Sequence, residues 1–216
     1  MLIVRKNALL SGGAKLPYAR QVEYLRNTGL VQYINTGILG GPGLRVVAEI
    51  TPQQKTNDKW AIGSINTNAR IYVAYQYGGS GNSGGRWGGG YGTFFSGTSS
   101  TAFGIGVKTS LDVEFTDDYQ ILKIDGEEKA RFAKSGFTGN VTNPLRLFGL
   151  NNNNSTTYAF LCDIGIVKIY TDGTLVRDFI PVIDRNGVAC MYDKVSGNLF
   201  YNAGTGTFLT NEDATS

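Results

Sequence analysis

The chain has 216 residues, of which 41% are hydrophobic and 12% aromatic, enough for one sizeable core. Its formal charge of +3 comes from 20 basic and 17 acidic residues, and the absence of a cationic stripe argues against nucleic acid as a partner. No apolar run approaches the roughly 18 residues of a membrane span, and the absence of histidine excludes Ser-His-Asp and Cys-His catalytic arrangements.

The amino-terminal segment is irregular. Small residues and Pro17 break any regular pattern, so we expect residues 1–20 to form an arm and residues 21–216 to form a single domain. The apolar start is interrupted at residues 5–7, so the longer hydrophobic region of a secretory signal is missing. This predicts a protein made in a cytoplasm and released by lysis, with a cleaved leader as the alternative.

Short alternating runs predict strands along the rest of the chain, separated by clusters of Gly, Pro, Asn and Asp. No amphipathic segment reaches the roughly 11 residues of an average helix. The fold class is therefore all-β, with two antiparallel sheets packed face to face as a sandwich. The predicted strands cover residues 22–25, 31–34, 44–51, 59–64, 69–75, 109–115, 119–124, 129–132, 145–150, 164–170, 175–180, 189–192 and 198–201.

Turn chemistry supports several of these boundaries. Asp125-Gly126 is a strong two-residue hairpin turn, and Thr171-Asp172-Gly173 reverses the chain between two further strands. Residues 35–37 are expected to end the second strand, and residues 151–155 form a polar loop.

Three stretches carry a family resemblance: residues 163–208 (DIGIVKIYTDGTLVRDFIPVIDRNGVACMYDKVSGNLFYNAGTGTF), residues 23–38 (EYLRNTGLVQYINTGI) and residues 111–132 (LDVEFTDDYQILKIDGEEKARF). They resemble the concanavalin A-like jelly rolls of the LamG type, found in bacteriophage virion proteins and bacterial surface proteins. The resemblance covers about residues 22–208 and implies the fold more strongly than the function.

A glycine-rich segment, residues 78–92, contains Arg86, Trp87 and Tyr91 and is expected to be a loop. Trp87 and Tyr91 offer flat apolar faces that can stack on sugar rings, and Arg86 is a hydrogen-bond donor, so these three form the candidate ligand-binding site. Two alternatives remain open. The aromatic rings fold back on the core, or the segment contacts a neighbouring subunit.

Catalysis is not expected. The glucanases of the resembled superfamily place paired carboxylates on one strand as Glu-x-Asp-x-x-Glu, whereas this chain has Asp112, Glu114 and Asp117 at that spacing with the residue types exchanged. We interpret these residues as solvated acids on the outer face of a strand. Acidic residues are too dispersed to single out a calcium site, although Asp58 or Asp172 with backbone carbonyls is conceivable, so no metal or cofactor is predicted.

The two cysteines, Cys162 and Cys190, are interpreted as buried strand residues, with a bridge between them as the alternative. Most aromatic residues are assigned to the core. They comprise Tyr72, Tyr75, Tyr77, Phe94, Phe95, Phe103, Phe115, Phe132, Phe148, Phe160 and Phe179.

These observations predict a non-catalytic decoration or fibre protein of a bacteriophage particle. Its partners would be other virion proteins, a further copy of the chain or a host-surface glycan, bound through loops at the rim of the sandwich. The alternative is a carbohydrate-binding or adhesion module on a bacterial cell surface.

Overall fold

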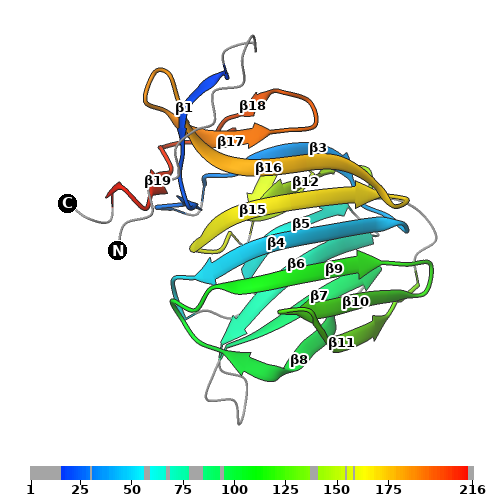
Figure 1. Cartoon of the computed structure of the whole chain (residues 1–216). Helices are drawn as coiled ribbons and strands as arrows, with labels where there is room; N and C mark the ends of the chain where they lie inside the picture. Colours follow the sequence, from blue (N-terminus) through cyan, green and yellow to red (C-terminus); the bar gives the residue numbers. More distant parts are fainter. Residues whose placement is uncertain are drawn as a thin grey trace.

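The computed structural model describes residues 16–29, 31–55, 59–66, 69–77, 85–92, 95–136, 141–153, 155–157 and 159–213. Within these residues the chain forms two mainly antiparallel sheets and no α-helix (Figure 1). The prediction of an all-β, two-sheet jelly-roll sandwich is confirmed. The described residues include no helix long and apolar enough to cross a membrane.

Sheet A lies in front in Figure 1 and runs in the order β11-β10-β9-β4-β15-β16-β17-β18, with β1, β2 and β19 paired alongside. Its strands are β1 (Tyr18–Gln21), β2 (Leu25–Arg26), β4 (Leu44–Pro52), β9 (Thr109–Phe115), β10 (Tyr119–Ile124), β11 (Glu127–Ala133), β15 (Cys162–Thr171), β16 (Thr174–Asp184), β17 (Ala189–Asp193), β18 (Leu199–Phe200) and β19 (Leu209–Thr210).

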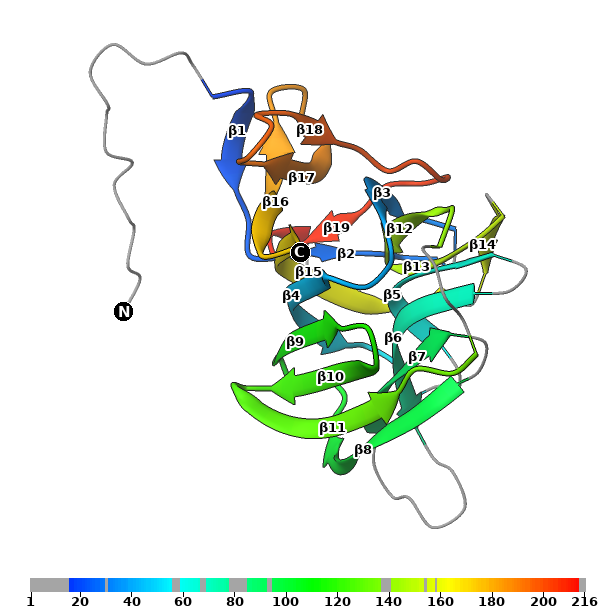
Figure 2. The same cartoon turned by 90° about the vertical axis from the view of Figure 1, so that its right-hand side faces the viewer.

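Sheet B lies behind it and runs in the order β14-β13-β5-β6-β7-β8, with β12 paired to β5 and β3 paired to β12. Its strands are β3 (Ile34–Leu39), β5 (Lys59–Asn66), β6 (Ala69–Tyr77), β7 (Gly85–Gly92), β8 (Phe95–Phe103), β12 (Pro144–Leu147), β13 (Gly149–Asn152) and β14 (Ser155–Thr157). Figure 2 shows the two sheets from the side, with sheet A on the left and sheet B on the right.

The main core fills the space between the sheets. Alternate residues of β4, including Leu44, Val46 and Ile50, are at most 2% exposed and belong to one cluster with residues of both sheets. Burial of this apolar surface is the main force that holds the two layers together.

The aromatic core prediction holds for most of the described side chains. Phe115, Phe148, Phe160 and Phe179 are at most 1% exposed, whereas Phe132 is only half-buried. Phe103 packs against the core from its edge. The side chains of Tyr77, Phe94 and Phe95 lie outside the described residues.

The carboxy-terminal hairpin is confirmed, since β15 and β16 pair antiparallel through the turn at Asp172 and Gly173. Both turn residues have positive φ, 49° and 76°, as a tight reversal with the strand twist requires. Asp125 and Gly126 form a similar turn between β10 and β11, with φ of 51° and 87°.

The first predicted strands are wrong in position. Residues 35–37 lie inside β3 instead of ending a strand, because the polar side chain of Thr36 is satisfied there: its Oγ1 donates to the Leu145 carbonyl at 2.9 Å. The predicted strand over residues 22–25 is replaced by β1 and β2, which flank Val22.

The predicted strand over residues 145–150 is divided in two. Phe148 has a φ of 69°, and its ring packs on Phe208 with centroids 4.8 Å apart, so the chain changes direction between β12 and β13. The predicted polar loop at residues 151–155 is also wrong in part, because Asn151 and Asn152 belong to β13 and Ser155 begins β14.

Residues 18–20 of the predicted amino-terminal arm lie in β1, which pairs with the end of β16. There Tyr18 and Tyr192 cover a small second cluster on the outer face of sheet A, formed by Ile180, Val182 and Cys190. Residues 1–15 lie outside the described residues.

Candidate functional site

The glycine-rich segment is a strand where the structure describes it. Residues 85–92 form β7, paired with β6 and β8, so the loop prediction is wrong for this part, and residues 78–84 lie outside the described residues. Alternate side chains of a strand point to opposite faces, so Arg86 and Trp87 lie on different sides of sheet B.

Trp87 and Tyr91 point inward, and both are 0% exposed. The Trp87 ring packs against Tyr75, with centroids 5.1 Å apart, and Tyr91 Oη donates to the Thr116 carbonyl at 2.6 Å. Burial raises the pKa of Tyr91 to about 12. The prediction that these two rings stack on a sugar is corrected here, because no face of either ring reaches solvent.

Arg86 lies on the outer face of sheet B, where it is half-buried, and its Nη1 donates to the Ser99 carbonyl at 3.0 Å. Of the three predicted site residues, only Arg86 is thus placed where a ligand can approach.

Other aromatic residues occupy that outer face. Trp60 is half-buried and meets the buried ring of Tyr72 edge-on, with centroids 5.1 Å apart and an interplanar angle of 70°. Both pack with Ala74, Leu150 and Ile65 in a cluster separate from the main core. We call this group the outer aromatic cluster.

A β-bulge places Trp60 in the outer aromatic cluster. The register shifts between Trp60 and Ile62, so that Ala61 and Ile62 both join the main core while Trp60 lies opposite Ala74. A bulge of this kind changes the direction of a side chain within an otherwise regular ladder.

Glycines make room for Tyr72. A Cβ on Gly63 would lie 2.6 Å from Tyr72 Cβ, and a Cβ on Gly90 would lie 2.4 Å from Tyr72 Cε1. The ring therefore lies along the sheet over β7, which explains why this part of the chain needs residues without side chains.

Two further arginines share the outer face of sheet B. Arg70 lies between the core residues Ala69 and Ile71, and Arg146 lies between Leu145 and Leu147, so both point away from the core. Arg146 is only 3% exposed, with its guanidinium 4.0 Å from the centroid of the Tyr33 ring. Burial lowers the pKa of Arg146 from its ordinary value.

The carboxylates considered for catalysis lie on the opposite sheet. Asp112 and Glu114 share the outer face of β9, and Asp112 accepts two hydrogen bonds from Arg45, at 2.8 and 2.7 Å. The interpretation as acids on the outer face of a strand thus holds for Glu114 and, as an ion pair with Arg45, for Asp112, whereas Asp117 lies in the turn between β9 and β10. Among the described side chains, no group of three His, Cys, Asp or Glu residues is placed to hold a metal ion.

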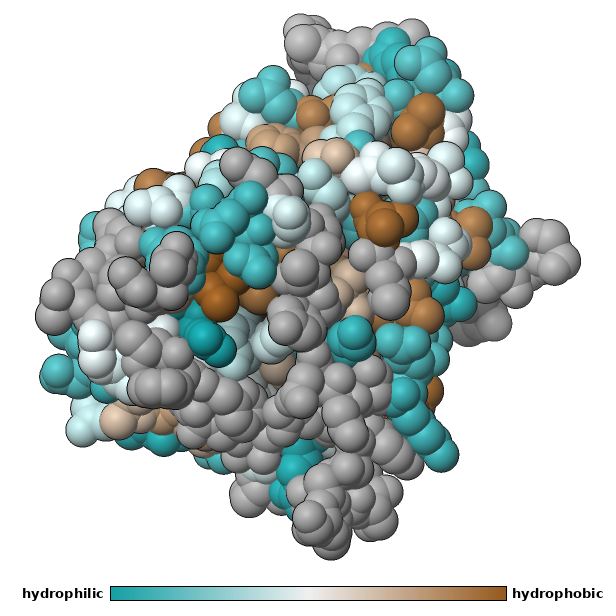
Figure 3. Space-filling model, turned by 180° about the vertical axis from the view of Figure 1, so that it is seen from behind, coloured by the Kyte–Doolittle hydropathy of each residue, from teal (hydrophilic) through white to brown (hydrophobic). Residues whose placement is uncertain are grey.

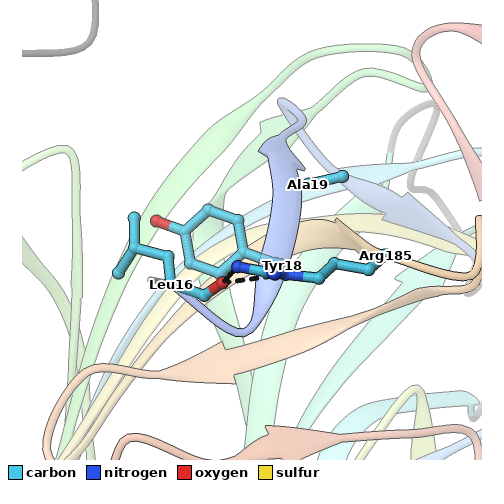
Figure 4. Close-up of a pocket in the computed structure, with 4 residues that line it drawn as sticks. All are labelled: Leu16, Tyr18, Ala19 and Arg185. Atoms are coloured by element: carbon cyan, nitrogen blue, oxygen red, sulfur yellow. Dashed lines mark hydrogen bonds between the residues drawn. The ribbon is translucent and has the colours of Figure 1, made fainter. Parts of the chain in front are cut away.

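A shallow depression lies at the other end of the molecule, beside β1 (Figure 4). Leu16, Tyr18, Ala19 and Arg185 line it, and Arg185 Nε donates to the Leu16 carbonyl at 3.1 Å. This contact ties the start of β1 to the β16–β17 turn.

Cys162 and Cys190 are free thiols, and both are buried, as predicted. Burial raises the pKa of Cys162 well above its usual value and that of Cys190 to about 12. Neither is a candidate nucleophile.

No protein-family model matches the chain, and neither does any curated protein. Several solved structures are similar to the chain. A candidate carbohydrate-binding protein from Bacteroides ovatus aligns with a TM-score of 0.53 and 11% identity, over 88% of this chain and 60% of that chain. Domains LG4-5 of the mouse laminin α1 chain align with a TM-score of 0.52 and 15% identity, over 84% of this chain and 50% of that chain. The chain has the concanavalin A-like jelly-roll fold.

A much larger structure is also similar. A mutant of the Trypanosoma rangeli sialidase that displays trans-sialidase activity aligns with a TM-score of 0.45 and 13% identity, over 62% of this chain and 21% of that chain. The chain thus spans between 21% and 60% of the length of these three structures. At such identities the comparisons concern the concanavalin A-like fold, and the site rests on the residues of this chain.

The outer aromatic cluster and its arginines form the candidate site of this jelly roll. Sequence reasoning found Arg86 but missed Trp60, Arg70 and Arg146, and it placed Tyr72 in the main core. Strand alternation could have placed Arg70, since it falls between apolar residues of one run, but the bulge at Trp60 has no clear sequence signal.

Proposed function

We propose that the chain is a carbohydrate-binding, lectin-like module that holds a glycan on the outer face of sheet B, with Trp60 as the stacking residue. The observation that carries this proposal is the pairing of Trp60 with Tyr72 outside the main core, beside outward-pointing arginines. Trp60 is half-buried, so part of its side chain stays open to solvent, and an aromatic ring is a flat apolar group that can pack on the apolar face of a sugar ring.

The environment of Trp60 favours a rigid site. Its partner Tyr72 is 2% exposed and is confined by Gly63, Gly90 and Leu150, so the aromatic pair is held in place before a ligand arrives. A side chain that is already ordered loses little conformational entropy on binding. The shared fold of the candidate carbohydrate-binding protein from Bacteroides ovatus gives further support.

We propose binding without turnover. Asp112, the first carboxylate of the exchanged motif, is held by Arg45 on the outer face of sheet A, on the other side of the sandwich from Trp60. The place of the module, on a bacterial cell surface or in a bacteriophage particle, is a prediction from the sequence alone, and no structural observation favours the particle.

The test is a glycan array with the wild-type protein and two variants, Trp60→Ala and Tyr119→Ala. Tyr119 is the matched control because it is an exposed aromatic residue of sheet A. We expect Trp60→Ala to weaken glycan binding by about tenfold or more and Tyr119→Ala to leave it unchanged. Equal binding by wild type and Trp60→Ala, or no bound glycan at all, would contradict the proposal.

A further inference from the structure

Acidic residues are distributed unevenly between the two sheets. The chain has 17 acidic residues, but none lies between Lys59 and Leu111 or between Lys129 and Cys162. As a result the strands of sheet B contain four basic residues, Lys59, Arg70, Arg86 and Arg146, and no Asp or Glu.

The strands of sheet A, by contrast, carry charges of both signs. Its strands contain carboxylates that form ion pairs between described side chains, for example Asp112 with Arg45 and Asp163 with Arg26. Those pairs balance the charge of sheet A locally. The small net charge of +3 therefore hides a difference between the two faces of the sandwich.

The arginines of sheet B flank the outer aromatic cluster. Arg70 lies at one end of β6, and Arg86 lies opposite Gln76 at the other end, so about 20 Å of strand separates them. Tyr72 and Ala74 lie between, with Trp60 beside Ala74. Figure 3 shows this face of the molecule, with several small hydrophobic spots separated by hydrophilic residues.

This arrangement suits a ligand that has both ring faces and negative charges. Guanidinium groups bind carboxylates and sulfates through paired hydrogen bonds, and the described strands of sheet B contain no carboxylate that would repel such groups. A spacing of about 20 Å lets the two arginines contact charges on different units of one polymer.

We propose that the glycan bound on the outer face of sheet B is an acidic polysaccharide, whose carboxylate or sulfate groups pair with Arg70 and Arg86 while a sugar ring packs on Trp60. This inference rests on the proposed function, since it names the class of glycan for the same surface.

The experiment measures binding of four polymers by isothermal titration calorimetry. The probes are polygalacturonate, dextran sulfate, uncharged dextran and single-stranded DNA. We expect the wild type to bind one or both acidic polysaccharides, with affinity that falls as salt rises, and to bind dextran and DNA at least about tenfold more weakly.

Two substitutions locate the interaction. Arg70→Gln removes a positive charge from sheet B, and Lys168→Gln removes one from the outer face of β15 in sheet A. We expect Arg70→Gln to weaken binding of the acidic polysaccharide about tenfold and Lys168→Gln to change it less than about twofold. Arg86→Lys, which keeps the charge at a residue bonded to the Ser99 carbonyl, should lower affinity less than Arg70→Gln.

The outcomes separate the two proposals. One result would overturn the acidic ligand and keep the glycan site. In it, uncharged dextran binds as tightly as the acidic polymers, Trp60→Ala abolishes this binding, and Arg70→Gln leaves it unchanged. If Arg70→Gln and Lys168→Gln weaken binding of the acidic polysaccharide equally, the assignment of the binding site to sheet B would be overturned. Preference for DNA would make the surface a nucleic-acid site. Binding of no polymer would overturn the acidic ligand, while the glycan array with Trp60→Ala separately decides the glycan site.

Discussion

Arg86 and Trp87 are adjacent in the chain and lie on opposite faces of β7, Arg86 at the surface of sheet B and Trp87 in the core. The two tryptophans of the protein therefore have different roles. Trp60 belongs to the outer aromatic cluster, whereas Trp87 supports the packing of the two sheets. This distinction underlies the first prediction.

Trp87→Ala should destabilise the fold by about 3–5 kcal/mol, because it removes a fully buried indole that packs on Tyr75 and Phe160. Trp60→Ala should cost less, since Trp60 is half-buried. Urea unfolding monitored by circular dichroism measures both. Equal losses from the two substitutions would show that the assignment of faces is wrong.

Gly63→Ala should also destabilise the protein, by about 1–3 kcal/mol, because the new Cβ would lie 2.6 Å from Tyr72 Cβ and 3.0 Å from the Ile71 carbonyl oxygen. Neither atom is the end of a flexible side chain. Gly29→Ala is the control, as a Cβ there meets no atom within 4 Å. Denaturation midpoints that do not differ between the two variants would contradict this account of Tyr72.

The sequence predicted the fold well where turn chemistry and alternation agreed. The β15–β16 hairpin is an example, because Asp172 and Gly173 tolerate the positive φ that the turn requires. The prediction failed where tertiary contacts decided the outcome. Thr36 stays within β3 because Leu145 accepts its hydrogen bond, and Phe148 takes a positive φ because its ring is held by Phe208.

The candidate site was harder to predict than the fold. Glycine in Gly88-Gly89-Gly90 indicated a loop, but these residues lie in a strand. Gly90 leaves room for the ring of Tyr72, and Gly89 leaves room for the side chain of Gln120 from sheet A. Such long-range neighbours are not visible in local composition, so Trp60 and Tyr72 were not recognised as partners.

Asp184 should make stability depend on pH. Its carboxylate accepts hydrogen bonds from the backbone N–H groups of Val188 and Asn186, both at 2.8 Å, and from Tyr201 Oη at 3.0 Å. The bond from Val188 is the main cause of a pKa below the usual value of the group. A lowered folded pKa contributes stability above the unfolded pKa of about 3.9, and this is lost as pH falls through the folded pKa.

Asp184→Asn should therefore lower stability at pH 7, and the difference from wild type should shrink as the pH is lowered from 4 toward 2. Asp118→Asn, at an exposed position in the β9–β10 turn, serves as the control. Urea unfolding across this pH range provides the measurement. A difference that stays constant with pH would exclude the charge of Asp184 as the cause.

The two thiols should be unreactive in the native protein. Cys162 and Cys190 are 0% exposed, and burial raises the pKa of both, so little thiolate forms at pH 8. A thiol reagent such as dithionitrobenzoate should label neither cysteine in buffer and both in guanidinium chloride. Labelling of one cysteine in buffer at the rate seen after unfolding would show that its strand is open.

The position of Trp60 gives the most direct test of the glycan site. In the Trp87→Phe variant, Trp60 is the sole tryptophan, so fluorescence quenching by acrylamide reports its exposure alone. The account predicts that saturating polygalacturonate or dextran sulfate reduces this quenching, because the polysaccharide covers the ring. Unchanged quenching of Trp60 while calorimetry shows the polymer bound would contradict it.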